Sequence, residues 1–242
     1  VFLATPYGQG WLVSRIEALN KPERLKSTGD ILASGKNVYS QNGEELVVRD
    51  FFQDREGGVF VDVGCAWPDV NSTTCYLDEH LNWTGIAVDA VESYRPAWEL
   101  KRPHTKFFAY AVTDHAGDRM KFYEAPADPT ISSLSKEWVE AWKQEPKEIE
   151  VETITLNKLL DDNGIDRIDF LSMDIEGAEL SALAGFDIDR FRPSLVCIEG
   201  RASNTDPKPI LSYFAAHGYE VIEKYAQYDK VNWYFTPAES SS

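Results

Sequence analysis

Acidic residues stand at the ends of four apolar runs that this sequence predicts to be strands. Asp62 belongs to the first run, Asp89 ends the second, Asp174 and Glu176 close the fourth, and Glu199 ends the fifth. Any one of them alone could cap a helix or face solvent. The carboxyl ends of parallel strands, however, meet at one edge of a sheet, where ligands bind. Together these residues predict an acidic crevice at that edge.

The charge of this crevice limits what it can bind. Carboxylates repel a pyrophosphate, and after Gly64 the sequence continues Cys-Ala-Trp-Pro, so neither GxGxxG nor a Walker loop is present. A cationic nucleoside without phosphates fits better, and S-adenosylmethionine carries a ribose, an ammonium and a sulfonium. Asp89 follows Gly64 by 25 residues, near the ~20-residue offset expected of a ribose-binding acid. We expect Asp62 to act through the loop or toward the ammonium.

Asp174, Glu176 and Glu199 are the candidate catalytic residues. Methyl transfer is an in-line displacement at a sulfonium carbon, so the protein mainly aligns the two reactants. A hydroxyl acceptor is a poor nucleophile at pH 7 and benefits from a base or a metal. Each of the three carboxylates could be the base. Asp174 and Glu199 could instead hold Mg²⁺, which takes oxygen ligands and would lower the pKa of the hydroxyl.

Strand and helix patterns alternate through most of the chain and must position these residues. Apolar runs predict strands at 58–64, 85–90, 106–112, 119–125, 168–177 and 194–200, with helical patterns between most of them. This alternation predicts an α/β fold with a doubly wound, mostly parallel, seven-stranded sheet. Residues 219–235 read as two final strands around a polar turn, an antiparallel hairpin at the sheet edge. The combination is the Rossmann-like class I methyltransferase arrangement.

The flanks of this pattern are less regular. We expect residues 1–38, with a helix from Trp11 to Leu19, to form an N-terminal arm or lid before a methyltransferase domain at 39–236. Residues 237–242 read as a frayed tail. Residues 126–148 are polar, resemble an insertion, and could form a lid over the acceptor site. Trp138 and Trp142 lie one helical turn apart in this insertion; they could stack on a sugar, but packing is favoured.

Composition restricts the partners and the compartment. The 242 residues contain 24 Lys and Arg against 40 Asp and Glu, a net charge of −16, which repels nucleic acid and anionic membrane surfaces. No run of 18 apolar residues predicts a membrane span. Three cysteines without zinc-site spacing suggest a reducing compartment. We therefore expect a cytoplasmic protein, membrane-associated only through a segment before Val1. The oligomeric state is not predicted.

Several stretches resemble the FkbM family of S-adenosylmethionine-dependent methyltransferases. In order they are YSQNGEE (39–45), FVDVGC (60–65), NSTTCYLDEHLNWTGIAVDA (71–90), TKFFAYAVTD (105–114), VETITLNKLL (151–160) and DFLSMDIEGAEL (169–180). The last of these is the most specific. The resemblance spans about residues 39–200 and implies a class I methyltransferase fold. It also implies O-methylation, often of a sugar or polyketide hydroxyl.

The resemblance implies a set of cofactor contacts, each carried over by position. The N-terminal helix would place against the cofactor Gln41 and Glu44. The methionine end would be lined by Asp62, Gly64, Asn71 and Thr73. The ribose and adenine would meet Asp89, Ala90 and Asp114. The floor near the transferred methyl would consist of Asp174, Glu176 and Gly177. The loop CAWPDV (65–70) departs from the glycine-rich form usual in the family.

The leading expectation is an O-methyltransferase acting on a hydroxyl of a sugar, glycan or glycosylated metabolite. Two other classes stay open. An NAD-dependent sugar oxidoreductase or epimerase would use a similar sheet, although the missing second and third glycines argue against it. A non-catalytic binding protein that has kept the fold would be compatible with the irregular loop at 65–70.

Overall fold

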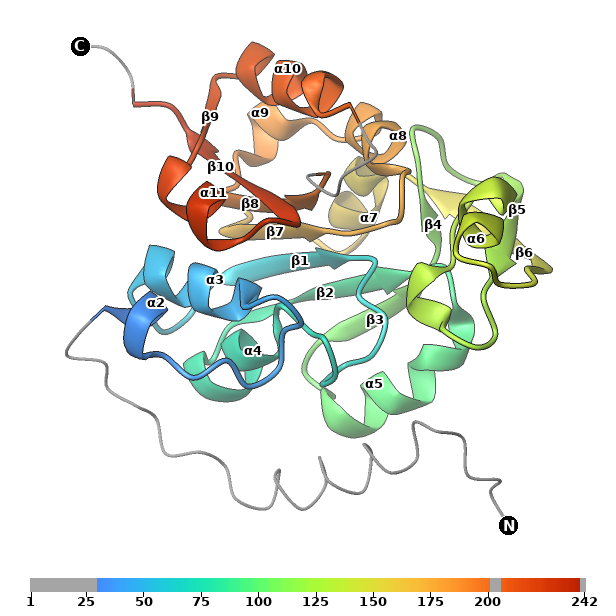
Figure 1. Cartoon of the computed structure of the whole chain (residues 1–242), viewed down its shortest axis with the longest axis horizontal. Coiled ribbons are helices and arrows are strands. Elements are labelled where there is room, and N and C mark those ends of the chain that lie inside the picture. Colours follow the sequence, from blue (N-terminus) through green and yellow to red (C-terminus); the bar gives the residue numbers. More distant parts are fainter. Residues whose placement is uncertain (1–29, 201–205, 240–242) are drawn as a thin grey trace. The chain divides into compact units, whose positions relative to one another are not determined.

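The computed structural model describes residues 30–200 and 206–239 (Figure 1). The chain divides into two compact units, residues 1–35 and 36–242. The described part of the first unit contains the short helix α2, Ile31–Ser34, which the side chain of Asp30 caps. The helix expected from Trp11 to Leu19 lies outside the described residues, and the role of residues 1–38 as an arm or lid stays a prediction.

The second unit contains a seven-stranded sheet of order β3-β2-β1-β7-β8-β10-β9. Its strands are β1 (Val59–Val63), β2 (Thr84–Asp89), β3 (Lys106–Ala109), β7 (Phe170–Met173), β8 (Leu195–Glu199), β9 (Tyr219–Val221) and β10 (Asn232–Pro237). β10 is antiparallel to both of its neighbours, and the other pairings are parallel. The order reverses at β1, with β2 on one side and β7 on the other. The predicted class I methyltransferase fold is confirmed.

The end of the sheet differs in detail from the expected hairpin. A helix, α11 (Glu223–Tyr228), joins β9 to β10 where the sequence predicts a polar turn, and β10 lies inside the sheet between β8 and β9. Tertiary contacts explain the helix. The Tyr225 side chain is buried, and its hydroxyl donates to Oδ2 of Asp50, 2.7 Å away. Packing against a distant helix thus fixes a segment whose own composition looks like a turn.

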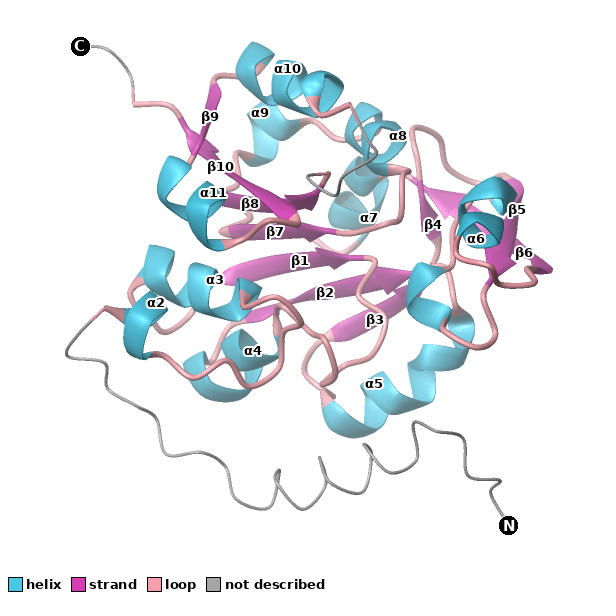
Figure 2. Cartoon of the chain, viewed as in Figure 1, coloured by secondary structure: helices cyan, strands magenta, loops and turns pink. Residues whose placement is uncertain are grey.

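Helices cover both faces of the sheet (Figure 2). They are α3 (Glu44–Phe52), α4 (Cys75–Leu81), α5 (Arg95–Lys101), α7 (Leu156–Asp162), α8 (Glu179–Ala184), α9 (Ile188–Phe191) and α10 (Lys208–Ala216), with a 3₁₀ turn η1 at Glu92–Tyr94. On one face Leu159, Leu183 and Phe214 pack with strand residues in a single buried cluster. Among the described residues, no helix has the length and apolar character that crossing a membrane requires.

A second, three-stranded sheet has the order β4-β6-β5. The run expected as one strand at 106–112 breaks at Tyr110, so that β3 joins the large sheet and β4 (Ala111–Val112) joins the small one. β5 (Arg119–Glu124) and β6 (Lys147–Ile154) pair antiparallel, with the ion pair Lys121–Glu148 across them. Between β5 and β6 lie η2 (Pro129–Ile131) and α6 (Lys136–Ala141). The insertion expected at 126–148 is therefore largely the connection of this hairpin.

A buried arginine fixes the loop that follows β1. The side chain of Arg102, next to α5, is 1% exposed. Its guanidinium donates to Oδ2 of Asp78 at 2.9 Å, to Oγ1 of Thr74 at 3.1 Å and to the Pro68 carbonyl at 3.3 Å. Thr74 in turn donates from Oγ1 to Asp62 Oδ2 at 2.6 Å. The loop is therefore held against α4 and α5 by a fully partnered buried charge.

Replacing Arg102 with methionine should destabilise the fold strongly, because Asp78 loses its ion-pair partner and Asp62 loses a nearby positive charge. We expect a loss of about 3–5 kcal/mol in the free energy of unfolding, measured by urea titration. The matched control is Lys158→Met, which breaks the exposed pair between Lys158 and Asp162 and should change stability little. Equal midpoints for the two variants would show that Arg102 does not hold this loop.

Candidate active site

A cavity opens at the carboxyl ends of β1, β2 and β7, where the strand order reverses. It contains about 550 Å³ of empty space, open solvent included. The large sheet and the turns after its strands contribute Val63, Gly64, Val88, Asp89, Ala90, Asp174, Ile175 and Glu176, and the β5–β6 hairpin contributes Phe122, Pro129, Thr130, Ser132 and Leu134. None of the described residues that line the cavity is basic. Its walls are mostly apolar, and its ionisable side chains are the carboxylic acids Asp89, Asp174 and Glu176 and the phenol of Tyr110.

Gly64 allows two backbones to meet beneath this cavity. Its φ is +80°, and a Cβ added there would lie 1.7 Å from the carbonyl oxygen of Asp174. The same turn is bonded on both sides: the Gly64 N–H donates to the Val88 carbonyl and the Asp174 N–H to the Val63 carbonyl, each at 2.9 Å. The glycine is thus required by the strand next to it, whatever its distance to a ligand.

Asp89 bonds the loop after β1 with one carboxylate oxygen and the turn after β2 with the other. Oδ2 accepts the N–H of Ala66 at 3.0 Å, and Oδ1 accepts the N–H of Val91 at 2.9 Å. Burial raises the pKa of Asp89 to about 6, and the two backbone N–H groups oppose that rise. Each carboxylate oxygen can accept more than one hydrogen bond, so Asp89 keeps acceptor capacity on the cavity side.

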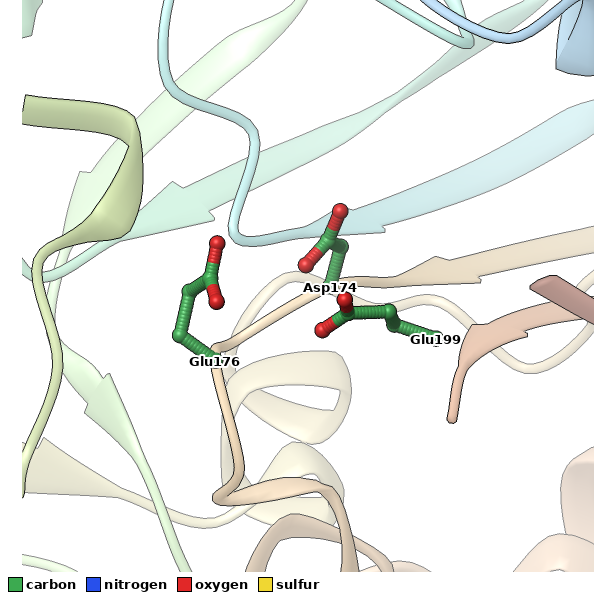
Figure 3. Close-up of side chains that lie close together, drawn as sticks. All are labelled: Asp174, Glu176 and Glu199. Atoms are coloured by element: carbon green, nitrogen blue, oxygen red, sulfur yellow. The ribbon is translucent and has the colours of Figure 1, made fainter. Parts of the chain in front are cut away.

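Three carboxylates meet at the edge of the cavity. Asp174, Glu176 and Glu199 each place an oxygen within 4.8 Å of the other two, and Figure 3 shows their carboxyl groups converging on one space. Asp174 and Glu176 come from the turn after β7, and Glu199 ends β8. Adjacent parallel strands that end together make this convergence possible.

The protonation of these carboxylates follows from burial and from their mutual repulsion. Burial, then Asp174 and Glu179, raise the pKa of Glu176 to about 8. Burial, then Glu176 and Glu179, raise the pKa of Glu199 to about 7. Asp174 lines the cavity with an exposed side chain, yet the surrounding protein and Glu199 raise its pKa well above the usual range. In the Asp174–Glu199 pair, Asp174 is the partner that keeps the proton.

A fourth acid, Glu179, positions Glu176 and was not among the expected site residues. Glu176 has a φ of +54°, an uncommon conformation for a residue with a side chain. Oε1 of the buried Glu179 accepts the N–H groups of Ile175, at 3.1 Å, and Gly177, at 3.3 Å. This tightens the turn around Glu176 and directs its carboxyl to the cavity. A glutamate in the first turn of a helix, three residues beyond Glu176, is the sequence signal that could have identified it.

Glu44 reaches the same region from α3. It is buried, its Oε2 accepts the N–H of Asn42 at 2.7 Å, and its Oε1 accepts an amide N–H of Asn232 at 3.2 Å. Asn232 is paired with Glu199 across β10 and β8. Glu44 lies close enough to Asp174 to raise the pKa of that carboxyl, so it belongs to the surroundings of the cluster.

The structure separates the other expected cofactor residues from the cavity. Asp62 is 4% exposed and bonds to Thr74, an arrangement in which it acts through the loop. Gln41 and Asn71 are exposed and Thr73 is half-buried, and none of the three lines the cavity. Asp114 is also exposed, and its Oδ1 pairs with Nδ1 of His115 at 2.7 Å. Cofactor contacts by these residues stay predictions.

The sequence model of the family described as "Methyltransferase FkbM domain" matches residues 7–221. The chain belongs to this family. It is therefore an S-adenosylmethionine-dependent methyltransferase, as the resemblance of its motifs implied. The alternative of an NAD-dependent oxidoreductase is thereby overturned, as is that of a non-catalytic binding protein. A search of the curated proteins found no match to the chain.

Solved structures similar to this FkbM methyltransferase share little of its sequence. A TehB-like SAM-dependent methyltransferase from Corynebacterium glutamicum is 12% identical, with 96% of this chain and 100% of that one covered and a TM-score of 0.47. An O-methyltransferase from Bacillus cereus in complex with SAH is also 12% identical, with 99% and 94% covered and a TM-score of 0.43. Likenesses this weak say nothing about the acceptor.

The raised pKa of Glu176 predicts a pH-dependent stability. In the unfolded chain this carboxyl titrates near its ordinary value of 4.5, whereas in the folded protein it titrates at about 8. The protonated form favours folding, so its contribution is complete below pH 4.5 and is lost as the pH rises through 8. Glu176→Gln cannot ionise. Relative to wild type, this variant should therefore gain stability progressively from pH 5 to pH 9 in urea unfolding.

The matched control is Glu152→Gln on the exposed side of β6. Its stability difference from wild type should stay flat over the same pH range. Parallel pH curves for wild type and Glu176→Gln would show that the Glu176 carboxyl is not held protonated by its surroundings.

Proposed function

We propose that this FkbM methyltransferase methylates a hydroxyl of a sugar, glycan or glycosylated metabolite. The observation that supports this acceptor chemistry is the convergence of Asp174, Glu176 and Glu199 at the cavity edge. A hydroxyl needs help to lose its proton, and a general base works best when its pKa lies near the operating pH. Glu199, with a pKa raised to about 7, and Glu176, raised to about 8, meet that condition.

The donor site proposed for S-adenosylmethionine is the cavity beside these acids. Asp89 has acceptor capacity for ribose hydroxyls, and Val63, Val88 and Ala90 offer apolar surface for a base. The absence of basic residues among the described lining residues suits a nucleoside without phosphates. The cluster of carboxylates would compensate the positive charges of the donor. When bound, this cofactor supplies an electrophilic methyl group.

Proton transfer is then the task of the chain's own residues. The ionised carboxylate of Glu199 or Glu176 would accept the proton of the acceptor hydroxyl. Asp174, which holds a proton in the pair with Glu199, would donate a hydrogen bond and would not compete as a base. Glu179 and Gly64 would keep Asp174 and Glu176 in place, since Glu179 bonds the turn after β7 and Gly64 packs against it.

A divalent cation is a second way to activate a hydroxyl at the same carboxylates. Asp174 and Glu199 would be its ligands, because their oxygens lie within 4.8 Å of each other and Mg²⁺ takes oxygen ligands. A bound cation would also relieve the repulsion that raises the pKa values of this cluster. The two routes differ in their sensitivity to a chelator.

Removing the Asp89 carboxylate should weaken donor binding. We expect Asp89→Ala to lower the affinity for S-adenosylhomocysteine about 100-fold in calorimetry, because two charge-assisted hydrogen bonds to ribose would be lost. Asp89→Asn, which retains one acceptor oxygen for the loop, should lose less. The control is Asp118→Asn in the exposed loop before β5. If Asp89→Ala bound S-adenosylhomocysteine with unchanged affinity, the proposal that the donor binds in this cavity would be wrong.

The acceptor class is tested with labelled S-adenosylmethionine and a panel of methyl glycosides. We expect label to enter the glycoside as an O-methyl group, and Glu199→Gln to lower kcat about 10²–10⁴-fold. With a carboxylate base, activity should survive EDTA. With Mg²⁺ at Asp174 and Glu199, EDTA should abolish activity and added Mg²⁺ should restore it. Labelling of amines alone, with no glycoside methylated, would contradict the proposed acceptor.

A further inference from the structure

An indole N–H in the β5–β6 hairpin is buried without a partner. Nε1 of Trp138, on α6, has no solvent contact and no hydrogen-bond acceptor among the described residues. Buried polar groups in native proteins are nearly always bonded, and an exception calls for a ligand, a water or a functional reason. The groups around this N–H therefore indicate what kind of ligand could bond to it.

Trp138 lies over the turn that carries Glu176. A Cβ added to Gly177 would be 3.9 Å from the six-membered part of the Trp138 ring. The indole N–H is close enough to the Glu176 carboxyl to lower its pKa, against the larger effects of burial and Asp174. The two groups nevertheless do not reach hydrogen-bonding geometry. The donor and the acceptor face the same region but do not satisfy each other.

The hairpin holds Trp138 in this place from two sides. Ser133 Oγ donates to the Glu176 carbonyl at 2.9 Å, and Ser135 Oγ accepts the Trp138 N–H of the backbone at 3.1 Å. Ser133 and Ser135 are joined by a further bond, 3.1 Å from the Ser135 N–H to Ser133 Oγ. Val139, next in the chain, is fully buried with Ala125 and Ile131. The place of the unpartnered Trp138 N–H beside Glu176 is therefore built into the fold.

We propose that Trp138 is a specificity-determining residue of the acceptor site, where a second hydroxyl of the acceptor bridges its indole N–H and an oxygen of the Glu176 carboxyl group. This inference rests on the proposed function. A hydroxyl both accepts and donates a hydrogen bond. One hydroxyl can therefore accept from the Trp138 indole N–H and donate to the Glu176 carboxyl at the same time. The aromatic ring offers an apolar face of the kind that packs on a sugar ring. The acceptor is thus a polyhydroxylated ring, with Glu199 left to act on the reacting hydroxyl.

Trp142 provides a matched control on the same helix. The sequence favoured packing for both tryptophans, but Trp142 is 58% exposed, because α6 ends at Ala141 and leaves it beyond the last turn. That expectation was wrong for Trp142. Neither tryptophan is among the residues that line the cavity, but of the two it is Trp138 that lies over Gly177 and beside Glu176. Trp142→Phe therefore removes an indole N–H close in sequence without touching the site.

The test compares Trp138→Phe and Trp142→Phe on a methyl glycoside that wild type methylates and on its monodeoxy analogues. Trp138→Phe should raise KM for the parent glycoside about tenfold, the worth of one hydrogen bond, with kcat nearly unchanged. On the analogue that lacks the bridging hydroxyl, wild type and Trp138→Phe should have the same KM. Trp142→Phe should match wild type throughout, and S-adenosylhomocysteine affinity should be equal in all three proteins.

Two failures are distinguishable. If wild type methylates no glycoside, the proposed function fails and this inference fails with it. If wild type methylates glycosides but Trp138→Phe keeps the wild-type KM on every one, the proposed function stands and the role of Trp138 is overturned. Should Trp138→Phe not fold, the indole ¹⁵N–¹H resonance of Trp138 in wild type decides: it should shift when a methylated glycoside is added with S-adenosylhomocysteine. A resonance that does not move overturns the inference.

Discussion

The close approach of two backbones at the strand-order reversal determines the geometry of the site. Gly64 and the Asp174 carbonyl are so near that a single Cβ would collide with it. Because β1 is bonded to β2 and to β7 at this level, the acid that ends β2 and the acids that follow β7 come to flank one turn. A side chain at this glycine would push β7 away, and with it Asp174 and Glu176.

The acidic residues at this edge of the sheet divide into two kinds. Asp62 and Glu179 have structural roles. The carboxylate of Asp62 accepts a hydrogen bond from Thr74, and that of Glu179 accepts hydrogen bonds from the turn around Glu176. Asp174, Glu176 and Glu199 repel one another and lie at the open cavity. A protein keeps such a cluster at an energetic cost, which a cationic ligand or a shared proton reduces. Asp89 belongs to both kinds, because it accepts backbone N–H groups of the neighbouring loops and also lines the cavity.

The fold could be predicted because its signals are local. Alternating strands and helices predict the parallel sheet, and motifs within single segments indicate the family. The helix α11 and the break at Tyr110 could not be predicted, because each depends on partners far away in the sequence, such as Asp50 for Tyr225. The same difference between local signals and distant contacts decides which site residues could be predicted. Acids at strand ends were identifiable by position, whereas Arg102 and Trp138 acquire their roles only from contacts made by the folded chain.

The position of β10 affects how the chain can assemble on the ribosome. Residues 232–237 are made after β9, yet they separate β9 from β8 in the finished sheet. Until they emerge, the edge of β8 is unprotected and β9 has no neighbour to pair with. Glu44, near the start of the domain, likewise cannot accept its hydrogen bond from Asn232 until that residue has been synthesised. The nascent chain therefore closes its sheet late, and Glu199 gains its neighbour Asn232 across β8 and β10 only when translation of the domain is almost complete.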